Sequence, residues 1–110
     1  MILVGIDIGK NQHTFSIIDK GTGEVLSNPS LFNNNQEGFL LLIKKLSSYA
    51  KSELLIGMED TGHYHFALLK YLLDSHYTVA LINQQLLILP ENCKAASLKM
   101  TLLILLLFVM

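Results

Sequence analysis

Two acidic residues directly follow apolar runs that are typical of buried strands. Asp7 follows the run ILVGI, and Glu59 follows the run LLIGM. A charge that is buried without a partner is costly, so each carboxylate needs a cation or a hydrogen-bond donor. Converging carboxylates are the hard oxygen ligands that Mg²⁺ and Mn²⁺ take. Asp7 and Glu59 are therefore the candidate catalytic and metal-ligating residues, although each could also simply cap a turn.

Other polar residues near these two acids have weaker claims. Asp60 lies next to Glu59, but adjacent residues of a strand face opposite sides. We expect Asp60 to lie at a turn or a helix N-terminus, where a negative charge is favourable. Lys10 and His63 are the candidate nucleic-acid contacts, because each could meet a phosphate, and each could equally be a solvated side chain. The other histidines show no spacing that is typical of metal ligands.

The elements that would position the two acids follow from hydrophobic periodicity. Short apolar and β-branched runs predict strands over 2–6, 13–19, 24–30, 53–58 and 78–82. Helical spacing predicts one helix over 35–49, opened by a capping box of Asn34 and Glu37. It predicts a second helix after residue 62 that ends near Ser75, with Tyr64 and Tyr71 in the core.

This order predicts an α/β fold of three strands, a helix, a strand, a helix and a final strand. The first three strands should form an antiparallel meander. Strands that are joined through helices are parallel with right-handed crossovers, so the first, fourth and fifth strands should run the same way. If the first and fourth are neighbours, Asp7 and Glu59 emerge at one edge of the sheet, where open α/β sheets bind ligands.

Composition sets limits on the class of protein. A chain of 110 residues, 51% hydrophobic and 15% charged, is at most one globular domain. Its net charge is -1, with eight lysines and no arginine, so no general basic surface points to nucleic acid. The single Cys93 excludes an internal disulfide, and the start of the chain does not resemble a secretion signal. We expect a cytoplasmic protein without a membrane anchor, because the apolar terminal run LLILLLFVM is about half of the ~20 residues that span a bilayer.

The sequence resembles a known family in four segments: VGIDIGKNQHTFSIID, FNNNQEGFLLLIKKL, GMEDTGHY and VALIN. They are similar to the amino-terminal half of the DEDD transposases of bacterial insertion sequences, over residues 2–83. The resemblance implies an RNase H-like fold related to the RuvC resolvase, with Asp7 and Glu59 as ligands of Mg²⁺ or Mn²⁺. It also implies two further aspartates, a second domain with a catalytic serine, and work on DNA with a structured guide RNA that the element encodes. Homo-oligomers are possible.

The tail departs from that family. No aspartate follows Ile82, although the family pattern places two there. Read one base out of frame, the codons for residues 99–101 contain GAC, an aspartate codon, and the codon three further on can also encode aspartate. We therefore expect a partial transposase domain over 1–83 and an out-of-frame tail over 84–110. Such a chain would be inactive alone, because it holds two of four carboxylates.

Two alternatives remain open at this point. The chain could be a non-catalytic remnant that binds nucleic acid or an intact transposase. More distantly, the opening GIDIGKNQHTFSIIDKGTGEVL resembles the phosphate-binding strands of actin-like sugar kinases. That class expects a Gly-, Ser- or Thr-rich turn where Lys10 and Asn11 stand.

Overall fold

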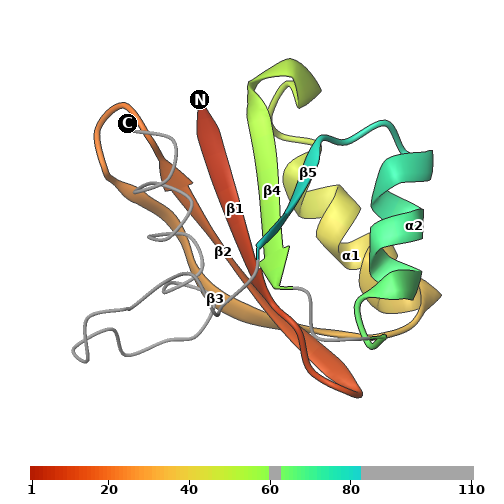
Figure 1. The fold of residues 1–110 in the computed structure, drawn as a ribbon. Helices are drawn as coiled ribbons and strands as arrows, with labels where there is room; N and C mark the ends of the chain where they lie inside the picture. Colours follow the sequence, from red (N-terminus) through yellow and green to blue (C-terminus); the bar gives the residue numbers. More distant parts are fainter. Residues whose placement is uncertain (60–62, 83–110) are drawn as a thin grey trace.

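A computed structural model describes residues 1–59 and 63–82 of the chain, which form one mixed sheet with two helices on one of its faces (Figure 1). The elements are β1 (Ile2–Asp7), β2 (Gln12–Asp19), β3 (Val25–Asn33), α1 (Gln36–Leu46), a 3₁₀ turn η1 (Lys51–Glu53), β4 (Leu54–Glu59), α2 (Phe66–Asp74) and β5 (Val79–Ile82). The predicted α/β order of elements is confirmed.

The strands lie in the order β3-β2-β1-β4-β5. β2 pairs antiparallel with both β1 and β3, which confirms the meander. β4 pairs parallel with β1 on one side and with β5 on the other. β1 and β4 are thus the central parallel neighbours, and Figure 1 shows both running toward the end of the molecule where α2 begins.

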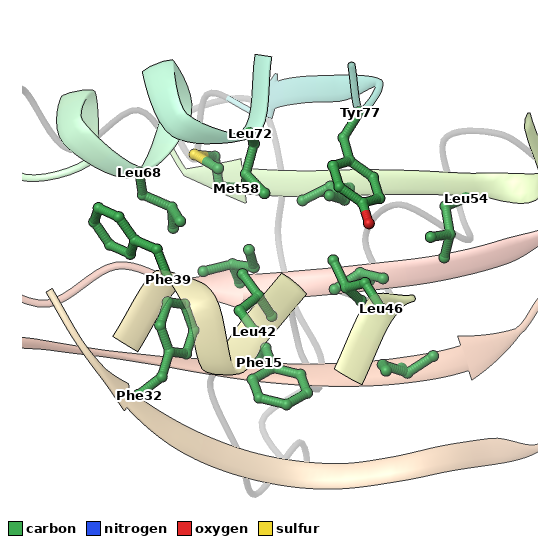
Figure 2. Close-up of a cluster of buried hydrophobic side chains, with 14 residues drawn as sticks. Phe15, Phe32, Phe39, Leu42, Leu46, Leu54, Met58, Leu68, Leu72 and Tyr77 are labelled. Carbon is green, nitrogen blue, oxygen red and sulfur yellow. The ribbon is translucent and has the colours of Figure 1, made fainter. Parts of the chain in front are cut away.

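The main core lies between the sheet and the two helices. Alternate residues of the strands point into it, since successive side chains of a strand face opposite sides. In Figure 2, α1 contributes Phe39, Leu42 and Leu46, and α2 contributes Leu68 and Leu72. The sheet contributes Val4, Ile6, Phe15, Ile17, Phe32, Leu54, Ile56 and Met58 to the same cluster. Each fully buried side chain of this kind contributes about 1.5–3 kcal/mol relative to exposure.

The intervening residues of β1 and β4 are buried as well. Leu3 and Leu55 are 0% and 8% exposed and lie outside the helix-side cluster. Gly5 of β1 pairs directly with Gly57 of β4, and both are buried. Burial on both faces explains why these two strands are nearly continuous apolar runs.

The edge strand β3 is longer than the sequence predicted. It continues three residues beyond Ser30, and its last residue, Asn33, pairs with Gln12. The polar residues of β3 are tolerated because one edge of the strand is free of strand partners in the described sheet. Pro29 fits the same position, since proline cannot donate to a ladder and is confined to edge strands and bulges.

The helix boundaries differ from the predicted ones for identifiable reasons. The N-cap of α1 is Asn35, whose side chain accepts from Gly38 N at 2.8 Å. The predicted cap, Asn34, does not cap the helix, and its side-chain amide donates to Lys10 O instead. Tyr64 precedes α2 and is 39% exposed, so its predicted core position is wrong, whereas Tyr71 packs against the core as expected.

Several expectations lie outside the described residues. They are the turn or helix-start role of Asp60, the turn at 61–62, and everything predicted for the tail over 84–110, Cys93 included. Within the described residues, no helix is long and apolar enough to cross a membrane.

Candidate functional site

Asp7 and Glu59 hold matched places at the ends of neighbouring parallel strands. The pairing of β1 with β4 runs from Ile2 opposite Leu54 to Ile6 opposite Met58, and the next residue of each strand is one of the two acids. Glu59 also pairs with Ile82 of β5. The backbone therefore places both acids at the carboxyl end of the sheet, as the predicted strand directions require.

Asp7 points away from the helices. Its neighbours Ile6 and Ile8 both pack with the helix-side cluster, so the alternation of the strand assigns Asp7 to the opposite face. The side chain is half-buried. Burial raises the pKa of its carboxyl above the ordinary value, and the nearby His13 opposes this rise.

The charge on Asp7 has little compensation from the described part of the chain. No hydrogen bond or ion pair to its carboxylate comes from residues 1–59 or 63–82. A partly desolvated carboxylate in this state favours either a proton or a cation. Its oxygen donors fit a hard divalent cation.

The sequence prediction missed His13. It is fully buried on β2, and its Nδ1 accepts a hydrogen bond from Gly9 N at 3.1 Å. Burial lowers the pKa of its imidazole, while Asn34 and then Asp7 act in the opposite direction. The signal was present in the sequence, because His13 alternates with the core residues Phe15 and Ile17 and so had to face inward.

The two candidate nucleic-acid contacts are exposed and lie in loops at this end of the sheet. Lys10 is in the connection from β1 to β2, and His63 precedes α2. The His63 ring lies beside the Tyr64 ring, tilted by 52° with centroids 4.6 Å apart. Asn34 Nδ2 donates to Lys10 O at 3.1 Å and reaches Tyr64 O at 3.5 Å. Hence the loops that carry Lys10 and His63 lie close together.

No ready-made metal centre is visible among the described side chains. The described side chains contain no group of three or more Asp, Glu, His or Cys residues that could hold a metal ion. The Glu59 side chain is not among the described side chains. A hollow of about 500 Å³ in the described surface lies instead between β3 and α1, with Leu31, Leu41, Lys44 and Lys45 in its lining. It contains neither acid of the candidate site.

Comparison with known families gives one match. The profile of the DEDD transposases of the IS110 type, described as "Transposase", matches residues 4–88. No curated protein matches the chain significantly.

Solved structures match the fold. RuvC of Thermus thermophilus in complex with Holliday junction substrate superposes with a TM-score of 0.56 at 10% identity, over 77% of this chain and 66% of that one. A second Thermus thermophilus RuvC structure gives 0.53 at 14% identity, over 76% and 62%. Fowlpox virus resolvase with Holliday junction DNA gives 0.50 at 15% identity, over 88% and 65%.

These similarities show that the fold is RNase H-like, of the RuvC kind, as the sequence resemblance implied. The chain spans slightly less than two thirds of the length of each of these resolvases.

Proposed function

Because the chain belongs to the DEDD transposase family, we propose that its described domain serves DNA cleavage and strand transfer in transposition, with Asp7 and Glu59 as carboxylate ligands of a divalent cation. The observation that carries this proposal is the matched register of the two acids on β1 and β4. Family membership also favours this function over phosphate binding by an actin-like kinase.

The residues present fit such an ion. Asp7 supplies a half-buried carboxylate, and burial disfavours its charged form. The described residues make no hydrogen bond to this carboxylate. Mg²⁺ or Mn²⁺, bound through carboxylates and water, suits these oxygen donors. In nucleases of this type, paired ions activate the attacking oxygen and stabilise the leaving oxygen. Asp7 and Glu59 would hold and orient the ion, and the half-buried setting of Asp7 strengthens that attraction.

DNA is the partner that fits this function, with Lys10 and His63 as contacts beside the carboxylate end of the sheet. Lys10 would neutralise a phosphate without reading sequence. The same proposal includes a structured RNA, encoded by the element, as a second partner. It also includes self-association of the chain and a location in the cytoplasm. The exposure of Lys10 and His63 in adjoining loops supports the DNA contact.

The second candidate is binding without cleavage. Two carboxylates are half of a four-carboxylate set, so this chain alone would hold a single ion weakly and would not cut DNA. The same proposal divides the chain into a domain over 1–83 and a tail over 84–110 translated out of frame. Sequencing the gene tests the tail directly, because a shifted frame closed by stop codons would overturn that part.

The purified chain tests the metal site. Mn²⁺ binding is measured by titration for the wild type, Asp7→Asn, Glu59→Gln and a control, Asp74→Asn, which removes an exposed charge paired with Lys70. We expect Mn²⁺ to bind the wild type and the control, and to bind each active-site variant at least tenfold more weakly. Equal affinities in all four proteins would overturn the proposed site. Incubation with plasmid DNA and Mn²⁺ then separates cutting from binding alone.

A further inference from the structure

His13 carries its proton on one identifiable nitrogen. The ring is fully buried, and Nδ1 accepts from Gly9 N at 3.1 Å. A nitrogen that accepts from a backbone N–H has no proton of its own, so in the neutral ring the proton lies on Nε2. Phe32 meets the ring edge-on, with centroids 5.3 Å apart, which restricts its orientation.

Nε2 of His13 and Oδ1 of Asn34 complement each other. Both atoms are buried, and neither has a hydrogen-bond partner within the described residues. One is a donor and the other an acceptor, and Asn34 raises the pKa of His13, as an oxygen acceptor near an imidazole N–H does. Buried polar groups that lack a partner call for an explanation. Each atom is the polar complement that the other lacks, so the two residues form a donor–acceptor pair.

The remaining atoms of Asn34 connect two loops. Its backbone N donates to Asn11 O at 2.8 Å, and Nδ2 donates to Lys10 O at 3.1 Å. Nδ2 also reaches Tyr64 O at 3.5 Å. Lys10 and Asn11 belong to the loop that follows β1, whereas Tyr64 lies in the segment between β4 and α2. Asn34 thus joins the loop after Asp7 to the loop after Glu59.

We propose that His13 and Asn34 are a pair of positioning residues that hold these two loops together and so fix the ends of β1 and β4 relative to each other. This inference rests on the proposed metal site at Asp7 and Glu59. His13 lies on the helix side of the sheet and Asp7 on the other, so His13 acts through the loop backbone and is not itself a ligand. Gly9 supports the arrangement, because a Cβ at that position would overlap Gln12 O.

The expected effect is on metal affinity. Replacing a residue that hydrogen-bonds to a metal ligand and orients it typically lowers the metal affinity by about 10–100-fold. His13 and Asn34 do not touch the ligands but act through the loop backbone. We therefore expect about tenfold weaker Mn²⁺ binding when either is replaced, the lower end of that range. The free energy of unfolding is measured in parallel, so that loss of structure is recognised.

The test uses the full chain and Mn²⁺ titration of four variants. His13→Asn keeps an acceptor for Gly9 N but is too short to approach Asn34, and Asn34→Ala removes the loop connection. Both should bind Mn²⁺ about tenfold more weakly. His13→Gln can place an amide near the Nε2 position and should restore most of the affinity. Gln12→Ala is the matched control, because it removes an exposed hydrogen bond to Asn33 one residue away from each member of the pair, and it should change nothing.

A second measurement needs no variant. The ¹⁵N chemical shifts of His13 in the metal-free wild type distinguish Nε2–H from Nδ1–H, and the pair requires Nε2–H. Nδ1–H would overturn the proposal even where the variants fail to fold. If Asp7→Asn abolishes Mn²⁺ binding but His13→Asn and Asn34→Ala do not weaken it, the positioning role of His13 and Asn34 is overturned. The proposed metal site would then still be supported. A wild type that does not bind Mn²⁺ would overturn both.

Discussion

Asp7 and Glu59 end two neighbouring parallel strands in the same register, one residue beyond the pair formed by Ile6 and Met58. Adjacent strands are about 4.8 Å apart, and carboxylate oxygens bind Mg²⁺ or Ca²⁺ at about 2.0–2.6 Å. Two acidic side chains that start from such positions can therefore reach one ion without distortion of the sheet. Under the proposed function, this register makes the two acids one pair of ligands for a shared ion.

Replacing Asp7 should stabilise the metal-free protein. Burial raises the pKa of the Asp7 carboxyl in the folded state above its ordinary value of 3.8, so ionisation at neutral pH weakens folding. Asp7→Asn removes that charge, and the free energy of unfolding at pH 7 should rise. The advantage should disappear as the pH falls through the raised pKa toward 3.8, where the wild-type carboxyl is protonated in both states. Urea unfolding between pH 7 and pH 3.5 measures it.

The matched control for this effect is Asp74→Asn, since Asp74 is an exposed partner of Lys70 on α2. Exposed ion pairs contribute little to stability, so this variant should be unchanged or slightly less stable. If Asp7→Asn lowers the stability at neutral pH by more than it does at low pH, the ionised carboxylate makes a favourable contact that burial of its charge does not explain.

Divalent cations should stabilise the wild type and couple the two acids. A ligand that binds only the folded state at a hundred times its Kd adds about 2.7 kcal/mol to the free energy of unfolding. We expect Mn²⁺ to give this increment in the wild type and little of it in Asp7→Asn, Glu59→Gln or the double variant. The losses should be strongly non-additive, because replacing either acid alone already abolishes a site that the two share. Independent, additive losses would indicate two separate ions.

Much of this arrangement could be predicted from the sequence because it depends on local patterns. Apolar runs before Asp7 and Glu59 indicated buried strands, and intervening helices indicated parallel connections. These two features alone place the acids at one end of the sheet. The 3.6-residue pattern likewise identified the face of α1 that carries Phe39, Leu42 and Leu46.

The features that escaped prediction depend on register between distant segments. Nothing near His13 in the sequence indicates Asn34, which is brought close only because β3 pairs with β2 as far as Asn33. The same contact explains the misplaced helix cap. Asn34 and Asn35 are both good cap residues, but Asn34 is drawn to the carbonyls of Lys10 and Tyr64, and Asn35 caps α1 instead.

Stability should fall on mild acidification because of His13. Burial lowers the pKa of its imidazole below the ordinary 6.5, so the unfolded chain binds a proton at a higher pH than the folded one does. The free energy of unfolding should therefore decrease as the pH falls from 6.5 through the lowered pKa, by at most about 1.4 kcal/mol per pH unit. His13→Gln should remove this slope, and Gln12→Ala, which keeps the His13 imidazole, should retain it. A slope that survives in His13→Gln would assign the acid sensitivity to another group.

Gly38→Ala should destabilise the fold although alanine is the better helix former. Propensity alone would favour alanine by about 1 kcal/mol inside a helix. A Cβ at Gly38, however, would overlap the backbone of Asn33 at O, C and N, and β3 cannot move away without loss of its pairing with β2. Overpacking of this kind costs about 1–3 kcal/mol, so we expect net destabilisation in urea unfolding. Lys45→Ala, exposed on the same helix, should stay within about 0.5 kcal/mol. A Gly38→Ala variant as stable as the wild type would mean that α1 does not pack this closely on the end of β3.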